Sequence, residues 1–264
     1  MPWAGIIARQ ARDGVIESDA ALTPLLTGMP SLAELPALCR AAVTILAGRH
    51  EALADAFERS ARAATAFVGR LHAVSEVTAT LFQAMAFDFL FDPERELLSI
   101  GYRIADESLD PNYYDLLASE ARLASLIAIA KGDLPTRHWF RLGRTLTPAG
   151  GGFVLVSWSG SMFEYLMPSL VMRAPAGSLL ERTNRLVVRQ QMKYGALRGV
   201  PWGASESAYN ARDLELTYQY SSFGVPDLGL KRGLGEELVI APYATALSAM
   251  IDPPAATRNF ARLT

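Results

Sequence analysis

The sequence predicts a predominantly α-helical protein, on three observations. From Leu35 to Phe91 the chain is rich in alanine, and its apolar residues recur at the spacing of one helical face. After Asp92-Pro93 the apolar segments are separated by Gly-rich or Pro-rich turns, and strands do not alternate with helices. No Gly-rich phosphate loop follows a strand pattern, so a nucleotide-binding fold is not expected.

The expected elements follow from these patterns in order. Residues 1–34 are weakly patterned, because Pro24, Gly28 and Pro30 interrupt any long element. Residues 35–91 predict two helices, the second of them long. Beyond them we expect helices near 112–131, 161–173, 177–194, 205–213 and 241–250, while 151–158 is compatible with a short strand. The chain therefore divides into a helical region, 1–86, and a second region, 87–264, that carries the candidate chemistry.

Composition and charge argue against several classes of function. The 25 basic and 27 acidic residues give a net charge of −2, which offers no electrostatic basis for binding nucleic acid or an anionic membrane. Uncharged ligands such as sugars remain open. Cys39 is the single cysteine, so an intrachain disulfide and a thiolate metal cluster are excluded. Three histidines without an HExxH spacing make a zinc enzyme unexpected, and we expect neither a metal nor a cofactor.

The sequence contains neither a cleavable signal pattern nor an apolar stretch that predicts a membrane-spanning helix. The N-terminus lacks a cleavable signal pattern, and no stretch approaches the ~20 apolar residues that cross a bilayer. We therefore expect this chain itself to be soluble.

The loops of the second region predict a surface that binds sugars. Aromatic and polar side chains precede its helices, as in the segments around Trp158 and Trp202. Aromatic faces stack on the apolar faces of sugar rings, while polar side chains hold the hydroxyls. The alternative is that both tryptophans are partly buried anchors, and this pattern alone leaves the two interpretations open.

Three glutamates are candidates for glycoside chemistry, which needs two carboxyl groups across the scissile bond. Glu120 is expected on a helix among apolar neighbours, where the neutral form of a general acid is favoured. Glu206 is expected in the first turn of a helix capped by Ser205, where the helix dipole favours an ionised nucleophile. Each also fits an ordinary helix-surface glutamate. Glu164 follows Ser161 by three residues, and a capping box competes there with catalysis.

The segments that carry these candidates resemble the central, glucoamylase-like domain of bacterial cyclic β-1,2-glucan synthases. The resemblance runs from about Phe87 to the C-terminus, and residues 1–86 match less distinctly. Five stretches carry it in the family's order: YYDLLASEARLASLIAIAKGDLP (113–135), SWSGSMFEYLMPSL (157–170), GVPWGASESAYNARD (199–213), YQYSSFGVPDLGLKRGL (218–234) and VIAPYATAL (239–247).

This resemblance implies an (α/α)6 toroid, here expected to be incomplete because the family continues with further helices beyond Thr264. It also implies retaining transglycosylation, in which a linear β-1,2-glucan is released as a ring. Glu120 is then the acid/base and Glu206 the nucleophile. The resemblance further implies that eight side chains bind substrate: Asp115, Trp158, Glu164, Trp202, Tyr209, Asn210, Arg212 and Tyr220.

The family also implies partners and a location. Its domain lies between a membrane-embedded glucosyltransferase and a phosphorylase-like region, on the cytoplasmic side of an inner-membrane enzyme. We therefore expect this chain to be a fragment of such an enzyme. Two alternatives stay open: an endo-β-1,2-glucanase that uses the same carboxylates for hydrolysis, and a non-catalytic remnant that binds glucan.

Overall fold

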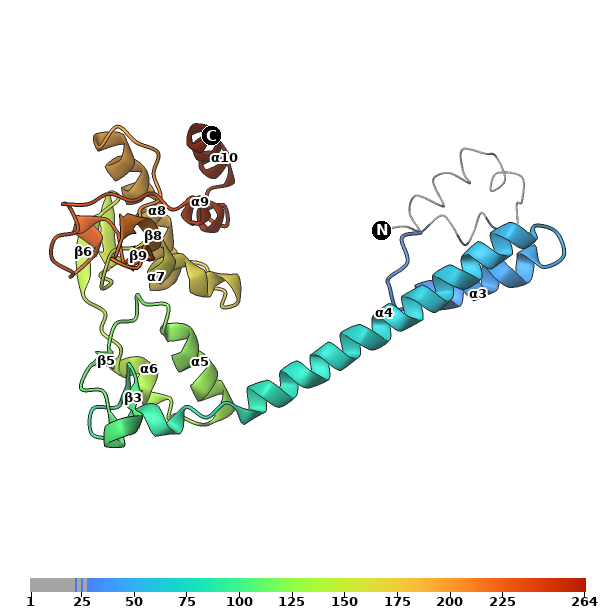
Figure 1. Cartoon of the computed structure of the whole chain (residues 1–264), viewed down its shortest axis with the longest axis horizontal. Coiled ribbons are helices and arrows are strands. Elements are labelled where there is room, and N and C mark those ends of the chain that lie inside the picture. The colour runs from blue at the N-terminus through green and yellow to red at the C-terminus, as the bar shows by residue number, and fades with distance from the viewer. Residues whose placement is uncertain (1–21, 23–24, 26–27) are drawn as a thin grey trace. The chain divides into compact units, whose positions relative to one another are not determined.

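The computed structural model describes Leu22, Leu25 and residues 28–264 of the chain. It divides into two compact units, Met1–Met85 and Ala86–Thr264 (Figure 1). The first unit is a helical hairpin of α3 (Leu35–Leu46) and α4 (Glu51–Ala84), so the two helices predicted in this segment are confirmed. Although α4 is 34 residues long, no helix in the described part of the chain is apolar enough to cross a membrane.

The hairpin is held by one buried apolar stripe from each helix. The side chains of α3 repeat every three or four residues and meet a matching row on α4, as amphipathic helices do. Cys39 lies in this stripe and is 2% exposed, and burial raises the pKa of its thiol. The buried members are Leu35, Cys39, Ala42, Leu46, Leu53, Phe57, Ala61 and Ala64.

The second unit mixes short helices with short strands. Its helices are α5 (Arg122–Lys131), α6 (Arg137–Arg141), α7 (Met162–Leu166), α8 (Leu179–Leu197), α9 (Pro242–Ser248) and α10 (Pro253–Leu263). Single 3₁₀ turns lie at Asp88–Leu90, Ile104–Asp106, Met167–Leu170 and Pro226–Leu228.

Across residues 28–264 the strands form four small antiparallel sheets. The first joins β1 (Phe91–Asp92), β2 (Leu97–Ser99) and β5 (Tyr113–Tyr114). The other three are pairs: β3 (Tyr102–Arg103) with β4 (Ser108–Leu109), β6 (Leu146–Ala149) with β7 (Gly152–Leu155), and β8 (Ser207–Arg212) with β9 (Tyr218–Ser221).

The prediction of an all-α protein, and with it the (α/α)6 toroid, is therefore wrong. Two of the predicted helices differ in the structure because their residues pair with another strand. The segment expected as a helix at 205–213 is strand β8, since its side chains alternate in exposure and its backbone pairs with β9. The helix expected from 112 begins only at Arg122, because the aromatic pair Tyr113-Tyr114 pairs with β2 instead.

The strand weighed at 151–158 is confirmed as β7. It pairs with β6 across the dipeptide Gly150-Gly151, with Ala149 opposite Gly152. Both glycines have positive φ, 62° and 87°. Two central residues with positive φ match the twist of a tight hairpin, and glycine adopts this backbone at the least cost.

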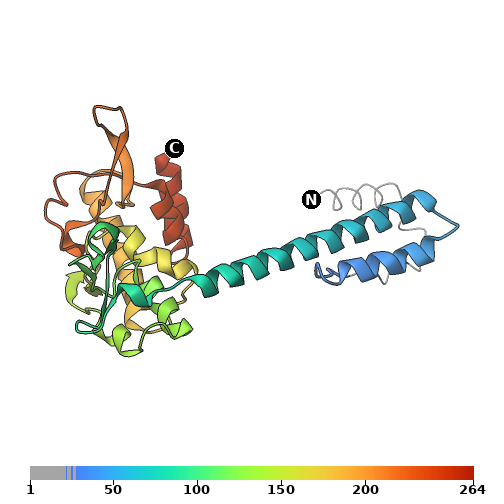
Figure 2. The ribbon, with the colours of Figure 1, turned by 60° about the horizontal axis from the view of Figure 1, so that its bottom comes forward.

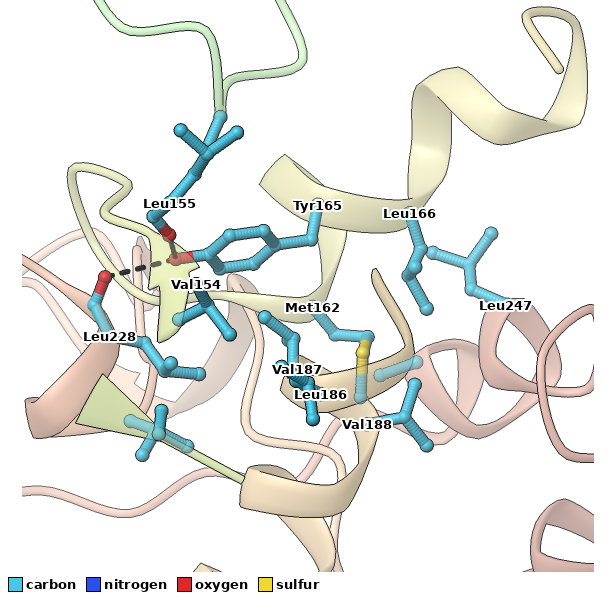
Figure 3. Packing of buried hydrophobic residues seen from close by; sticks show 14 of the residues in the cluster. Val154, Leu155, Met162, Tyr165, Leu166, Leu186, Val187, Val188, Leu228 and Leu247 are labelled. Carbon is cyan, nitrogen blue, oxygen red and sulfur yellow. Dashed lines mark hydrogen bonds between the residues drawn. The ribbon is translucent and has the colours of Figure 1, made fainter. Parts of the chain in front are cut away.

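The core of the second unit lies between α7, α8 and strand β7 (Figure 3). Val154 and Leu155 of β7 are fully buried, as are Met162 and Leu166 of α7. The hydroxyl of Tyr165 donates to the backbone oxygens of Leu155 (2.8 Å) and Leu228 (3.0 Å), so the buried tyrosine also joins two distant segments.

A tight approach between α8 and the following loop predicts the effect of one small substitution. A Cβ atom at Gly195 would lie 2.8 Å from the Cβ and 3.0 Å from the Cα of Trp202. Helix propensity favours alanine over glycine by ~0.5–1 kcal/mol, whereas overpacking against backbone costs ~1–3 kcal/mol. We therefore expect Gly195→Ala to lower the free energy of unfolding, measured by denaturant titration.

The matched control for this prediction is Gly69→Ala in α4. A Cβ atom there meets nothing within 4 Å, so only the propensity term acts, and we expect α4 to be stabilised. A Gly195→Ala protein more stable than wild type would show that the loop at Trp202 yields to the added methyl group.

Candidate active site

Glu164 is the centre of a buried cluster of serines at the start of α7. Its side chain is 6% exposed. Its carboxylate accepts hydrogen bonds from the hydroxyls of Ser157 (2.9 Å), Ser159 (2.7 Å) and Ser161 (3.1 Å). The backbone amides of Ser159 and Ser161 also donate to it, at 3.0 and 2.9 Å. The predicted capping box with Ser161 is confirmed, and Oε2 of Glu164 accepts most of these hydrogen bonds.

Arg122 ties this cluster to the segment of Glu120. It is 2% exposed, and burial lowers the pKa of its guanidinium to about 10. One terminal nitrogen donates to the backbone oxygens of Ser119 and Glu164, each at 3.0 Å, and the other donates to that of Tyr165 at 2.7 Å. A single buried cation thus fixes the turn before α5 against α7.

Glu120 lies in that turn, directly before α5, rather than on the helix that the sequence predicts. Its side chain is half-buried, and the hydroxyl of Ser119 donates to it at 3.3 Å. Burial raises the pKa of the Glu120 carboxyl above its ordinary value, and the negative charges of Glu164 and Glu206 raise it further. The neutral, proton-donating form of Glu120 is therefore favoured.

Glu206 lies in an extended segment that leads into β8, so the predicted first turn of a helix is wrong here. The hydroxyl of Tyr220 donates to its carboxylate at 2.8 Å. The hydroxyl of Tyr243 donates to its backbone oxygen at 2.8 Å and also contacts the Ser205 hydroxyl at 2.8 Å. Ser205 in turn accepts from the backbone amide of Phe163 at 3.1 Å, which joins the segment to α7.

Tyr220 connects the two carboxylates electrostatically. Burial of its hydroxyl end raises its pKa, and so do the hydrogen bond to Glu206 and the charges of Glu206 and Glu120. Tyr220 is nevertheless 64% exposed as a residue, while its hydroxyl contacts the Glu206 carboxylate. Glu120, Glu206 and Tyr220 form one neighbourhood of interacting groups, which we call the carboxylate pair site.

The remaining expected substrate-binding residues divide by exposure. Trp158 is 60% exposed and Asp115 is exposed, so both offer surface. Trp202 is 5% exposed. Its backbone amide donates to Asn259 at 3.1 Å and its backbone oxygen accepts from Asn259 at 2.7 Å. Trp202 is therefore a packing anchor without an open ring face, which corrects its assignment as a sugar platform.

The last three expected residues lie on β8. Tyr209 is half-buried and packs edge-on against Phe223, with ring centroids 5.0 Å apart. Asn210 and Arg212 are exposed. The structure thus brings Tyr220 to Glu206 directly and leaves Asn210 and Arg212 on the strand that begins beside it.

Sequence reasoning missed Arg122 and Tyr243 as parts of this site. An arginine two residues after Glu120 is a signal that was present, but on a continuous helix it would point away from that glutamate. In the structure α5 begins at Arg122, and its side chain reaches the backbone of α7. Tyr243 is distant in sequence and carried no local signal beyond its place in the stretch 239–247.

Comparison with known proteins places the sequence that carries this site in a family. Residues 112–264, more than half of the chain, match the family model Glycoamylase, described as "Putative glucoamylase". The chain belongs to the Glycoamylase family. Within 194 residues it is 61% identical to the cyclic beta-(1,2)-glucan synthase NdvB of Rhizobium meliloti (strain 1021).

This relative confirms the resemblance to cyclic β-1,2-glucan synthases. The match covers 74% of the chain and 7% of the relative's own length. Membership of the Glycoamylase family, together with the synthase relative, supports a carbohydrate-active enzyme domain.

Proposed function

We propose that the chain catalyses retaining transglycosylation of linear β-1,2-glucan, with Glu120 as acid/base and Glu206 as nucleophile. The observation that carries this proposal is the asymmetry of the two carboxyl groups. The pKa of Glu120 is raised by burial and by the charge of Glu206, whereas the Glu206 carboxylate accepts a hydrogen bond from Tyr220. Two carboxyl groups with different environments can divide the roles of proton donor and nucleophile.

The proposed reaction has two displacements. Glu206 attacks the anomeric carbon and forms a glycosyl ester, while Glu120 passes its proton to the departing glycosidic oxygen, directly or through a substrate hydroxyl. Glu120, now ionised, then removes a proton from the hydroxyl at the other end of the same glucan. That oxygen attacks the anomeric carbon, closes the ring and releases Glu206 as a carboxylate.

Product analysis with a linear β-1,2-glucan tests this proposal. The full chain is incubated with the glucan, and products are separated by mass and by the presence of a reducing end. Rings support transglycosylation. Short linear products of retained configuration support the second candidate, an endo-β-1,2-glucanase. In that reaction water replaces the sugar hydroxyl as the acceptor at the same carboxylates. Binding without turnover identifies a non-catalytic glucan-binding remnant and overturns the catalytic proposal.

The raised pKa of Glu120 predicts a pH dependence of activity. The acid must be protonated for the first displacement, so kcat/KM is expected to fall as pH rises through the pKa of Glu120. Because that pKa lies above the usual ~4.3 of glutamate, the alkaline limb is expected at a higher pH than for an ordinary carboxyl.

A titration of Glu120 by NMR checks the assignment. Its midpoint is expected to match the alkaline limb, and to move to lower pH in Glu206→Gln, where one of the charges that raise it is gone. An unchanged midpoint in that variant would mean that the two carboxyl groups do not interact.

For the wider enzyme, we propose that this chain acts beside glucosyltransferase and phosphorylase-like regions on the cytoplasmic side of an inner membrane. The support is the relative, of whose length this chain spans 7%.

A further inference from the structure

The β8–β9 hairpin has two distinct faces. Exposure alternates along both strands, and in Figure 2 the hairpin (orange) extends away from the rest of the second unit. Side chains of a strand alternate between faces, and cross-strand partners share a face. The inner face holds the half-buried residues Ser207, Tyr209, Ala211, Gln219 and Ser221, and the outer face holds the exposed residues Ala208, Asn210, Arg212, Tyr218 and Tyr220.

The outer face begins at the carboxylate pair site. Tyr220, opposite Ala208 in the register, donates to Glu206 at 2.8 Å. Tyr218 stands two residues further along the same strand, so its Cα lies ~7 Å from that of Tyr220. Tyr220 and Tyr218 are 64% and 53% exposed as residues. They form a row of open aromatic surface that leads away from Glu206.

Arg212 fixes the outer ring of this row. Its guanidinium carbon lies 4.4 Å from the centroid of the Tyr218 ring, and a terminal nitrogen donates to the Tyr218 hydroxyl. The guanidinium therefore covers one face of the Tyr218 ring and restricts the motion of that side chain. Less conformational entropy is then lost when a ligand binds to the ring. Asn210 adds an exposed amide between Ala208 and Arg212, where the register of the two strands shifts.

The charges of the hairpin decide between ligands that stack on aromatic rings. Nucleic acid bases stack on tyrosine and arginine as sugars do, but their phosphates need a basic groove. Residues 206–221 contain three acidic residues, Glu206, Asp213 and Glu215, and one basic residue, Arg212, which gives 1 − 3 = −2. Asp213 and Glu215 lie in the turn between the strands, and the outer face itself carries only Arg212 as a charged side chain. A single cation is not the basic groove that phosphates need, so this surface suits an uncharged carbohydrate chain.

We propose that the outer face of the β8–β9 hairpin is a binding arm for a linear glucan. Sugar rings stack on Tyr218, while Asn210 and Arg212 hydrogen-bond their hydroxyls, at a subsite beyond the bond that reacts. The choice of β-1,2-glucan rests on the proposed function, whereas the arm itself rests on the hairpin.

The test measures binding of linear β-1,2-glucans of several lengths by calorimetry, in the full chain carrying Glu206→Gln so that turnover does not consume the ligand. Tyr218→Thr keeps the preference for strand but removes the ring, and is expected to raise Kd roughly two- to tenfold, the range that aromatic contacts supply. Tyr218→Phe keeps the ring and is expected to bind nearly as wild type. The loss should grow with glucan length, because only longer chains reach the arm.

Tyr102→Thr is the matched control, since Tyr102 is an exposed tyrosine (42%) on the short strand β3. Unchanged affinity in Tyr218→Thr overturns the proposal. So does an equal loss in Tyr218→Phe, which would leave Arg212–Tyr218 as a pair that only stabilises the hairpin. If wild type proves inactive while Tyr218→Thr still weakens binding, the catalytic proposal fails and the arm stands. If wild type is active and Tyr218 has no effect, the arm fails alone.

Discussion

Glu206→Gln is expected to reduce turnover of linear β-1,2-glucan by roughly 10⁴-fold or more, as the loss of a catalytic nucleophile does. Glutamine keeps the shape of the side chain and can still accept the hydrogen bond of Tyr220, but it cannot form the glycosyl ester. Affinity for glucan should therefore stay close to that of wild type. A lower kcat with an unchanged Kd indicates that Glu206 makes an interaction in the transition state that it does not make with the bound substrate.

Glu215→Gln is the matched control for this change. It is an exposed glutamate on the same hairpin, so the identical loss of charge is made away from the carboxylate pair site. Initial rates and calorimetric binding of both variants separate catalysis from electrostatics of the hairpin. A Glu206→Gln protein with wild-type turnover would remove Glu206 from the mechanism.

Sequence reasoning succeeded where a structure depends on near neighbours. The capping box at Ser161 and Glu164 spans three residues, and the α3–α4 hairpin follows a helical period, so both could be predicted. Strands β8 and β9 could not, because their pairing joins residues as far apart as Ala208 and Tyr220, with an irregular register between Ala208 and Arg212. An alanine-rich, serine-capped segment has no local feature that outweighs a helical pattern, and only its partner strand decides otherwise.

The residues of the site also differ in whether they depend on near neighbours or on contacts distant in sequence. The burial of Trp202 depends on α8 and on Asn259, which lie far from it in sequence, so aromatic content could not separate an anchor from a platform. Glu120 was predicted to have a raised pKa because of apolar neighbours on a helix. Its raised pKa has another origin, burial in a turn that Arg122 holds against α7.

Glu164→Ala is expected to destabilise the second unit by roughly 3–5 kcal/mol, because several buried donors lose their acceptor at a cost of ~1–3 kcal/mol each. The substitution leaves the hydroxyls of Ser157, Ser159 and Ser161 and two backbone amides without their buried acceptor. Glu164→Gln should fall between alanine and wild type, because its oxygen accepts while its amide nitrogen opposes the remaining donors.

Glu181→Ala provides the matched control, since Glu181 holds the same position after the capping serine of α8 but is part of a surface pair with Arg185. Its loss should cost no more than ~1 kcal/mol. Urea titration followed by tryptophan emission reports mainly on the second unit, which contains Trp139, Trp158 and Trp202. A Glu164→Gln protein that keeps its stability but loses turnover would instead place Glu164 in the chemistry, because a purely structural carboxylate cannot separate the two measurements in that way.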